Sequence, residues 1–436
     1  MKTTAKPHKI GLVSLGCAKN LVDSEKLMRQ LEACNFELIF DPVDATNIET
    51  AIINTCGFIT DAKQESIDTI LQFARAKQHN QISHLYVMGC LSERYKSTLQ
   101  KEIPEVDAFF GVNDLEKIIR HLGGIWQNGL IGERKLTTPS HYSYLKIAEG
   151  CDRQCSFCAI PLIRGKHISK PLEELISEAE RLAEKGVREI NVISQDTTYY
   201  GLDLYKKRRL PDLLHSLAGI RGLEWIRLHY AYPDGFPLEL LDVIRDHPNI
   251  CNYLDIPLQH ISDRILQSMH RGITASETRQ LISDIRNAIP EITLRTTLMV
   301  GFPGETDEEF DELLKFVEET RFDRLGVFTY SHEEDTGAFR LTDSVPEKIK
   351  QQRAEELMAV QEKISRELNN KRLGQIIQVI IDRKEGDYYI ARTASDSPEV
   401  DNEVLIPVGK SRIKSGSFHQ VRITGAESFD IYGELK

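Results

Sequence analysis

Short apolar runs alternate with amphipathic helical patterns in the first third of the chain. The runs at 8–14, 51–54 and 84–88 predict β-strands, and the patterns at 21–33, at 61–76 and after Ser92 predict helices. Strand–helix alternation of this kind is typical of a parallel sheet with right-handed crossovers. A loop-like segment follows at 137–140, so we expect a first domain at residues 1–135.

The alternation continues with longer units in the middle of the chain. We expect strands at 144–148, 189–194, 225–230, 253–257, 293–300 and 325–330, and helices at 171–185, 211–217, 237–246, 276–288, 306–319 and 346–369. Pro171, Pro211 and Pro237 suit the first turn of their helices, where a missing N–H costs nothing. Six strand–helix units predict a partial (β/α)6 barrel, an incomplete relative of the eight-fold barrel, at residues 140–370.

Residues 371–436 show no helical period. Five short strands are expected at 375–381, 388–393, 403–407, 419–423 and 429–433, with turns at 385–387 and 414–416. Short strands at this density predict a small all-β, Greek-key barrel. The predicted fold class is therefore α/β, with a parallel N-terminal sheet, a partial barrel and a small β-barrel in three domains.

Composition narrows the class of protein. With 41% hydrophobic and 28% charged residues, the chain is unlike a disordered, collagen-like or coiled-coil protein. No apolar run approaches the roughly eighteen residues of a transmembrane helix, and Met1–Lys9 is polar with no apolar signal region behind it. We therefore expect a cytoplasmic protein with no membrane partner. In that compartment eight cysteines are expected to be ligands or catalytic thiols rather than disulfides.

The formal charge of −11 is unevenly distributed. Residues 1–140 carry a net −1 and residues 371–436 a net zero, which leaves −10 in the middle. An acidic chain without a basic block is a poor candidate for nucleic-acid binding, whereas a basic protein partner is compatible with it. The simpler alternative is that the acidity only keeps the protein soluble.

Three cysteines lie within eight residues after the first barrel strand. Cys151, Cys155 and Cys158 form the pattern C-x3-C-x2-C, and thiolates at such short spacings favour an iron–sulfur cluster. Since a fourth local cysteine is missing, one iron would keep an open position, as a catalytic metal site requires. The alternative is a zinc knuckle, for which His167 is the nearest further ligand.

Three other cysteines are far apart in the sequence but share one structural position. Cys17, Cys56 and Cys90 each follow a predicted strand, and parallel strand ends meet at one sheet edge, where open α/β sheets bind ligands. Helix N-termini at that edge favour anionic sulfur, so the three thiols could meet at one cluster. Burial as small hydrophobic residues is the alternative, and it is our expectation for Cys34 and Cys251.

The loop GCDRQCSFCAIPLIRG resembles the cluster loop of the radical S-adenosylmethionine (SAM) superfamily. The resemblance implies that Cys151, Cys155 and Cys158 hold the catalytic 4Fe–4S cluster, whose open iron binds SAM. It also implies that an electron from this cluster cleaves SAM to a 5′-deoxyadenosyl radical. Phe157 matches the position that lies near the adenine in this superfamily.

The segments SLGCAKNLVDSE, NTCGFITDAKQES and VMGCLSERY resemble the N-terminal domain of the methylthiotransferase family, and residues 371–436 resemble its TRAM domain. Together the resemblances cover nearly the whole chain. They imply that Cys17, Cys56 and Cys90 hold an auxiliary 4Fe–4S cluster that carries the sulfur to be inserted. They further imply two SAM molecules per turnover, one for methyl transfer and one for the radical, and an electron donor such as flavodoxin or ferredoxin.

The resemblance extends to positions that would contact SAM. Matching residues follow the second, fourth and fifth barrel strands, at C-terminal strand ends where barrel enzymes place their sites: Ser194, Gln195, Asp196, Gln259, Met299 and Gly301. Each has an ordinary alternative. Met299 could be a core residue, Gly301 and Gly304 could be turn residues, and Glu305 could simply charge the first turn of the next helix.

The family divides by substrate into enzymes that modify adenosine in tRNA and enzymes that modify an aspartate of ribosomal protein S-twelve. SLGCAKNLVDSE resembles the second, RimO-type branch, because the tRNA branch tends to have Gln-Met-Asn where this chain has Ala18-Lys19-Asn20. A tRNA-binding module should be basic, yet residues 371–436 are neutral and the barrel is acidic. We therefore predict β-methylthiolation of an aspartate in S-twelve. The alternatives are tRNA methylthiolation, a non-catalytic two-cluster electron carrier and a zinc-bound scaffold.

Overall fold

The computed structural model describes residues 8–409 and 412–436. Most of the polar N-terminus that bears on the expected location, residues 1–7, lies outside this range. The chain forms two compact units, the first comprising Met1–Thr138, Tyr144–Asp152 and Ala159–Glu178, and the second Pro139–Ser143, Arg153–Cys158 and Ala179–Lys436. In the part described, no helix is both long and apolar enough to cross a membrane.

The first unit is built on a five-stranded parallel sheet in the order β2-β1-β3-β4-β5. Its strands are β1 (Lys9–Ser14), β2 (Glu37–Phe40), β3 (Thr50–Thr55), β4 (His84–Gly89) and β5 (Ala108–Phe109). Its helices are α1 (Ala18–Ala33), α2 (Thr60–Gln78), α3 (Cys90–Glu102) and α4 (Leu115–His121), followed by the short 3-10 helix η1 (Asn128–Leu130). The structure thus confirms a parallel α/β sheet in this part of the chain.

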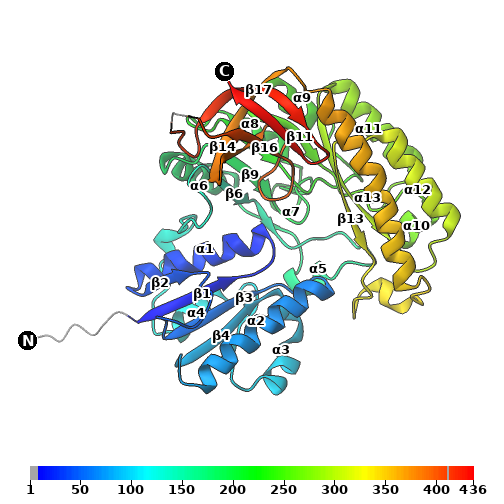
Figure 1. The fold of residues 1–436 in the computed structure, drawn as a ribbon. Coiled ribbons are helices and arrows are strands. Elements are labelled where there is room, and N and C mark those ends of the chain that lie inside the picture. Colours follow the sequence, from blue (N-terminus) through cyan, green and yellow to red (C-terminus); the bar gives the residue numbers. More distant parts are fainter. Residues whose placement is uncertain (1–7, 410–411) are drawn as a thin grey trace, which may run out of the picture. The chain divides into compact units, whose positions relative to one another are not determined.

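Both faces of this sheet are buried, as parallel sheets require. Along β3, Ala51 and Ile53 pack into one apolar cluster with α2 and α3, whereas Ile52 packs into a second cluster with α1 and α4. The two pairs of helices therefore cover opposite faces, as Figure 1 shows for α1 and α2. This double cover explains why the strands are nearly continuous apolar runs in the sequence.

A second parallel sheet has six strands in the order β13-β12-β11-β10-β9-β6. They are β6 (Tyr142–Lys146), β9 (Glu189–Ile193), β10 (Trp225–Leu228), β11 (Ile250–Asp255), β12 (Thr293–Val300) and β13 (Arg324–Thr329). The larger helices between them are α6 (Leu172–Glu184), α8 (Leu210–Ala218), α9 (Glu239–Asp246), α11 (Ala275–Ala288) and α12 (Asp307–Thr320). The six predicted strand–helix units are therefore confirmed.

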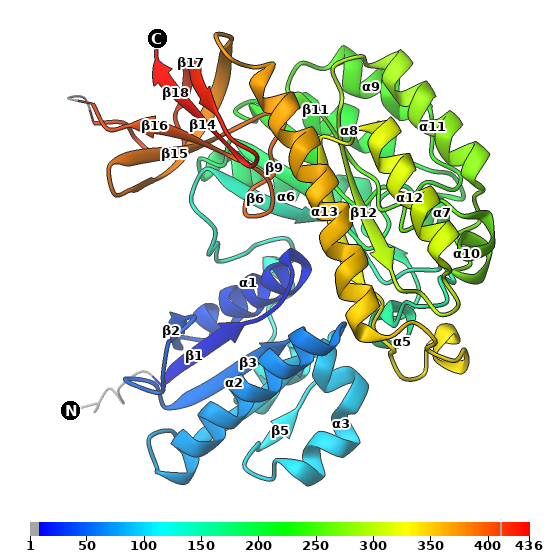
Figure 2. The same ribbon diagram turned by 45° about the vertical axis from the view of Figure 1, so that its right-hand side comes forward.

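Shorter elements complete the middle of the chain, and the long helix α13 (Glu347–Asn370), labelled in Figure 2, contacts the edge strand β13. The short elements are the β7 (Ala148–Glu149) and β8 (Ile168–Ser169) pair, α5 (Ile160–Arg164), α7 (Leu202–Tyr205), α10 (Asp263–Ser268) and the 3-10 helix η2 (Gly337–Arg340). Because α13 covers β13, the six-stranded sheet needs no further strand to protect that edge.

The C-terminal residues form a closed five-stranded barrel in the order β14-β15-β16-β18-β17. Its strands are β14 (Ile376–Glu385), β15 (Tyr388–Thr393), β16 (Glu403–Pro407), β17 (Phe418–Ala426) and β18 (Asp430–Leu435). Alternating residues fill its interior, among them Val379, Ile381, Ala391, Val404 and Val421. The predicted small β-barrel is confirmed.

This small barrel lies against the N-terminal ends of the six parallel strands. Glu189, the first residue of β9, accepts hydrogen bonds from Arg392 of β15 and from Arg227 of β10. Asp401, in the loop between β15 and β16, accepts hydrogen bonds from Tyr253 Oη at 2.7 Å and Arg295 Nε at 3.3 Å. A buried ion-pair network therefore covers the N-terminal strand ends of the six-stranded sheet. The predicted SAM contacts lie at the opposite, C-terminal strand ends.

Candidate active site

Cys17, Cys56 and Cys90 lie at one edge of the first sheet. Cys56 and Cys90 directly follow β3 and β4, and Cys17 lies three residues after the end of β1. These three strands are neighbours in the sheet and run parallel. Cys17 precedes the first residue of α1, and Cys90 is the first residue of α3, so two of the thiols lie at helix N-termini. The three sulfur-bearing strand ends are therefore adjacent, as the strand pattern predicts.

Glycines beside these cysteines allow the strand ends to approach closely. At Gly16, whose φ is +88°, an added Cβ would lie 2.7 Å from Cys56 Cβ and 3.0 Å from its sulfur. At Gly57 an added Cβ would lie 2.7 Å from the backbone of Leu91, the residue after Cys90. Since real Cβ atoms do not tolerate such distances, side chains at these positions would push the cysteine-bearing loops apart.

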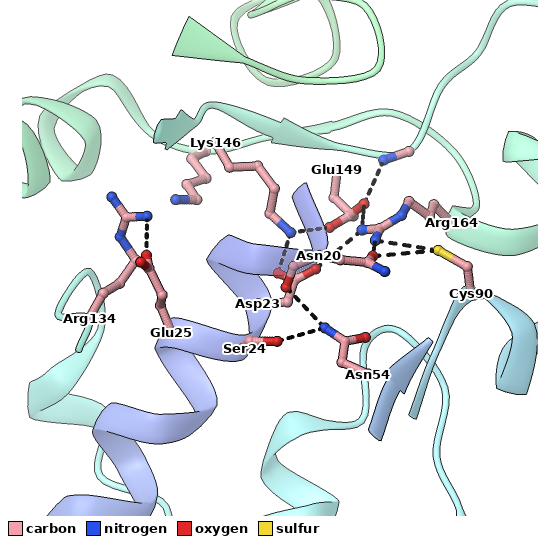
Figure 3. Close-up of polar contacts among 12 residues, drawn as sticks. Asn20, Asp23, Ser24, Glu25, Asn54, Cys90, Arg134, Lys146, Glu149 and Arg164 are labelled. Carbon is pink, nitrogen blue, oxygen red and sulfur yellow. Dashed lines mark hydrogen bonds and ion pairs between the residues drawn. The ribbon is translucent and has the colours of Figure 1, made fainter. Parts of the chain in front are cut away.

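Asn20 connects the three strand ends, as Figure 3 shows in part. Its Nδ2 donates to the carbonyl oxygens of Leu15 at 2.9 Å and Thr55 at 3.0 Å, which follow β1 and end β3. Its Oδ1 lies 3.6 Å from Cys90 Sγ, at the end of β4. Because Asn20 is buried, this single amide fixes the geometry of the edge where the thiols lie.

The thiols differ in how readily they ionise. Desolvation of its sulfur raises the pKa of Cys17, but Lys19, Arg164 and the backbone N–H groups of the first turn of α1 outweigh this, so its pKa is lowered. Burial raises the pKa of Cys56 and raises that of Cys90 to about 12, although Arg164 acts in the opposite direction at both. The charge of Cys17 acts on Cys56, and the charges of Cys17 and Cys56 act on Cys90, which places the three thiols in one electrostatic environment.

The donor set suits a cluster better than a single ion. Among the described residues, no group of three or more His, Cys, Asp or Glu side chains is spaced to hold one metal ion. A 4Fe–4S cluster does not require that spacing, because its thiolates bind different iron atoms. Adjacent thiols, helix N-termini and a neighbouring guanidinium all favour a site that carries negative charge. That Cys17, Cys56 and Cys90 bind the cluster stays a prediction.

A buried group of charged side chains surrounds this edge (Figure 3). Lys146 contacts Asp23 and donates to Glu149 at 2.6 Å, and Arg164 donates to Glu149 at 2.7 Å and to Cys90 Sγ at 3.5 Å. None of these charged residues, nor Asn20, was among the site residues predicted from the sequence. For Asn20 and Arg164 the available signal was their position close to cysteines, since Asn20 lies three residues after Cys17 and Arg164 six residues after Cys158.

The C-x3-C-x2-C loop is held by contacts along its length. Cys151, in the first unit, donates its backbone N–H to Gly165 O at 3.1 Å. In the second unit, Cys155 Sγ lies 3.4 Å from both Tyr232 Oη and Arg271 Nη1. The backbone N–H of Cys158 donates to Cys155 O at 3.1 Å, which makes a tight turn between the last two cysteines.

His167 has local partners of its own. Its Nε2 lies 3.1 Å from Ser169 Oγ, and its backbone N–H donates to Asp152 Oδ1 at 3.0 Å. The ring is buried beside Ser169, and a role for His167 as a zinc ligand stays an alternative.

Asp196 serves the cysteine loop in the second unit. Its carboxylate accepts hydrogen bonds from Arg153 Nε at 2.8 Å and from Thr198 Oγ1 at 2.6 Å. The guanidinium of Arg153 also pairs with Asp234 and lies 3.9 Å from the ring centre of Tyr232. Asp196 thus fixes the loop through Arg153, and its predicted contact with SAM stays a prediction.

Other predicted SAM contacts lie together at C-terminal strand ends. Phe157 and Met299 are partly buried and pack against the same apolar cluster, which includes Phe302. The backbone N–H of Met299 donates to Gln259 O at 2.7 Å, and Gln259 has a φ of +74°, which is uncommon for a residue other than glycine. Phe157, Met299 and Gln259 are therefore brought together from three separate segments.

The remaining predicted contacts have different surroundings. Ser194 is buried directly after β9, and its Oγ has no hydrogen-bond partner among the described groups, whereas Gln195 beside it is half-buried. Gly301 has a φ of +74° and donates its backbone N–H to Glu305, whose carboxylate also pairs with Arg353 at 3.1 Å. An unpartnered buried hydroxyl at a strand end suits a ligand contact, but these roles stay predictions.

Family models match the chain in three places. Residues 9–111 match the uncharacterized protein family UPF0004, residues 145–317 match the radical SAM superfamily, and residues 373–435 match the TRAM domain. The radical SAM match implies a 4Fe–4S cluster and SAM. These matches agree with the parallel sheet, the six-stranded sheet and the small barrel.

Solved structures share the fold at low sequence identity. The radical SAM methyltransferase TsrM from Kitasatospora setae matches with a TM-score of 0.56 and 14% identity, over 73% of this chain and 72% of that one. The cobalamin-dependent radical SAM enzyme OxsB matches with a TM-score of 0.53 and 13% identity, over 82% of this chain and 56% of that one. At such identities the likeness concerns the fold alone.

Curated relatives are similar along their full length. The ribosomal protein uS12 methylthiotransferase RimO of Christiangramia forsetii is 54% identical over 98% of this chain and 94% of its own. RimO of Phocaeicola vulgatus is 54% identical over 99% of this chain and 100% of its own. The chain therefore belongs to the RimO family of ribosomal protein uS12 methylthiotransferases, which are radical SAM enzymes.

Proposed function

We propose that this chain methylthiolates the β-carbon of an aspartate in ribosomal protein uS12, using SAM and two 4Fe–4S clusters. The observation that carries the proposal is the presence of two separate cysteine sets, one at a sheet edge and one in the barrel loop, in a chain that is 54% identical to RimO relatives along its length. An enzyme with a single cluster would need only the second set as cluster ligands.

The two sets suit different tasks. Cys151, Cys155 and Cys158 would bind the catalytic cluster, since three thiolates leave one iron open to SAM. Cys17, Cys56 and Cys90 would bind the auxiliary cluster. When bound, these groups supply one-electron reduction, a 5′-deoxyadenosyl radical and the sulfur to be transferred. The protein positions them and excludes water, which is the usual division of labour in cofactor enzymes.

Residues of the second unit would shape the SAM pocket. Phe157 and Met299 offer an apolar surface for the adenine, and Ser194 offers a buried hydroxyl without a partner among the described groups. Arg271 and Tyr232 hold Cys155 from two sides, which fixes this sulfur before a cluster binds. Preorganised ligands of this kind avoid a conformational cost when the cofactor arrives.

Charge supports a basic protein substrate. The middle of the chain carries a net charge of −10, and the C-terminal barrel carries none. A surface of this sign attracts a basic ribosomal protein and repels the phosphates of RNA. The proposal also includes a separate electron donor, such as flavodoxin or ferredoxin, because the reaction consumes reducing electrons.

The test is an anaerobic assay of the reconstituted full chain with uS12 and with tRNA. We expect mass spectrometry to detect one added methylthio group on a single aspartate of uS12 and none on tRNA. Modified tRNA with unmodified uS12 would establish the alternative substrate, and no SAM consumption at all would favour an electron carrier.

Variants separate the two cysteine sets in the same assay. Cys155→Ala should abolish SAM cleavage, whereas Cys56→Ala should retain SAM cleavage and lose sulfur insertion. Cys34→Ala is the matched control, because Cys34 lies outside both sets and should keep both activities. Full methylthiolation by Cys56→Ala would disprove the two-cluster proposal.

A further inference from the structure

One buried guanidinium faces a predicted cluster ligand. Arg164 ends α5, and its side chain is 2% exposed. Its Nη2 lies 3.5 Å from Cys90 Sγ and also donates to Asn20 Oδ1. Its Nη1 donates to Glu149 Oε1 at 2.7 Å and to Asp23 Oδ2 at 3.3 Å (Figure 3).

In the contact between Arg164 and Cys90, only the guanidinium can donate the hydrogen bond. A guanidinium has five N–H donors and no acceptor, and it stays protonated in proteins, so the sulfur of Cys90 must accept. Thiolates and metal-bound sulfurs accept hydrogen bonds well, whereas a neutral thiol is a weak acceptor. The orientation of Arg164 therefore suits a Cys90 sulfur that carries negative charge.

Arg164 reaches Cys90 from a fixed position. Asn20 must present its Oδ1 to Arg164, since its Nδ2 is already bound to the carbonyl oxygens of Leu15 and Thr55. Ile163, the residue before Arg164, packs with Cys90 in one buried apolar cluster. The hydrogen bond to Asn20 and the packing of Ile163 thus both hold the guanidinium at this sulfur.

The surrounding charges leave the sulfur site open to further negative charge. Two carboxylates, Asp23 and Glu149, are matched by two cations, Lys146 and Arg164. The acidic groups are therefore already compensated without the thiolates. In a buried environment of low dielectric constant, a cation at contact distance favours each additional negative charge on its neighbour.

We propose that Arg164 is a positioning residue of the auxiliary cluster, which fixes Cys90 as a ligand and raises the reduction potential of that cluster. The inference rests on the proposed two-cluster function. Reduction adds one negative charge to a cluster, and hydrogen bonds and nearby charge are among the factors that set its potential. Because Arg164 lies six residues after Cys158, the segment that carries the radical SAM cysteines would also tune the other site.

The test isolates the auxiliary cluster. A full-length variant with Cys151, Cys155 and Cys158 all replaced by Ala keeps only the first cysteine set. After anaerobic reconstitution with iron and sulfide, iron content and an EPR-monitored redox titration give the cluster occupancy and its midpoint potential. In this background we expect Arg164→Met to shift the midpoint to a more negative value, and Arg164→Lys, which keeps the charge, to shift it less.

Arg134→Met is the matched control. Arg134 is equally buried in the same unit and pairs with Glu25 at 2.9 Å and Glu178 at 3.1 Å, but both its ion-pair partners are carboxylates rather than a thiol. It should lower stability without moving the midpoint. If Arg164→Met alone fails to bind a cluster, the positioning role is supported. Arg164→Gln, which removes the charge but keeps an N–H donor, then tests the potential, and an unchanged midpoint in that variant would overturn the effect on potential.

The remaining outcomes separate the two proposals. A background variant that binds no iron–sulfur cluster would overturn the two-cluster function, and the role of Arg164 with it. A bound cluster whose midpoint is the same in Arg164→Met as in Arg134→Met would overturn the role of Arg164 alone.

Discussion

The guanidinium of Arg392 binds the carboxylate of Glu189 through two parallel hydrogen bonds, of 2.7 and 3.2 Å, across 203 positions of sequence. Both side chains are buried, at 3% and 0% exposure. Burial by itself raises the pKa of Glu189, but Arg392 and Arg227 hold that pKa below its usual range. The pair therefore stays ionised and joins the small C-terminal barrel to the first residue of β9.

Breaking this pair should destabilise the protein strongly. Arg392→Met leaves a buried carboxylate with less compensation, so we expect the free energy of unfolding to fall by about 3–5 kcal/mol in urea denaturation. Glu224→Gln is the control, because the Arg188–Glu224 pair is 3.1 Å long but exposed, and its loss should cost roughly 0–1 kcal/mol. Equal losses from the two substitutions would contradict the role of the buried network.

A methyl group at Gly16 should damage the first cysteine set selectively. The added Cβ meets Cys56 at 2.7 Å on a backbone with φ of +88°, so Gly16→Ala should cost about 1–3 kcal/mol and reduce the iron content while SAM cleavage continues. Gly129→Ala is the control, since no atom lies within 4 Å of its Cβ position. A Gly16→Ala protein with the full wild-type iron content would show that the close approach is unimportant.

His260 should make the protein sensitive to acid. Its ring is fully buried, and burial lowers the pKa of His260 to about 3. The unfolded chain binds this proton near pH 6.5, whereas the folded protein binds it only near pH 3, so protonation favours unfolding. The free energy of unfolding is therefore fully retained above pH 6.5 and falls as the pH is lowered toward 3.

We expect His260→Gln to reduce the dependence of unfolding free energy on pH by roughly 1 kcal/mol per pH unit between pH 6 and 5. Urea denaturation at several pH values measures this slope. The exposed His79 provides the control substitution His79→Gln, which should keep the wild-type slope. An unchanged slope in His260→Gln would mean that another group causes the acid sensitivity.

Cys251 should be a packing residue without a cofactor role. It is 3% exposed in a cluster with Trp225, Tyr253 and Ile380, and burial raises the pKa of Cys251 to about 11, although Arg227 opposes this. We expect Cys251→Ala to lose about 1 kcal/mol of stability and to keep full iron content and SAM cleavage. Iron loss comparable to that of Cys56→Ala would assign Cys251 to a cluster instead.

Much of the fold was predictable, because its parallel strands are long apolar runs. The strand predicted at 293–300 is observed as β12 over the same residues, and the one predicted at 388–393 is observed as β15. The strands β2 and β5 were not predicted. They are short and are the two outermost strands of the first sheet. It also missed α5, whose five residues are too few to show a helical period.

The candidate site was predictable where sequence motifs or strand ends mark it. The common edge of Cys17, Cys56 and Cys90 follows from the parallel direction of their strands, which alternation predicts, whereas the order that makes β1, β3 and β4 neighbours comes from the structure. The contact of Arg164 with Cys90 could not be predicted, because it joins residues 74 positions apart through a short helix. Asn20 was missed for a similar reason, since its role depends on two carbonyl groups at the ends of separate segments.

The closure of the six-stranded sheet by the small barrel also limits how this protein could change in evolution. Asp396 binds Arg324 of β13, and Asp401 binds Tyr253 and Arg295, so a foreign C-terminal module would leave several buried charges without partners. Exchange of this module between relatives would succeed only together with matching changes at the N-terminal ends of the strands. The two parts therefore have to vary as one inherited unit.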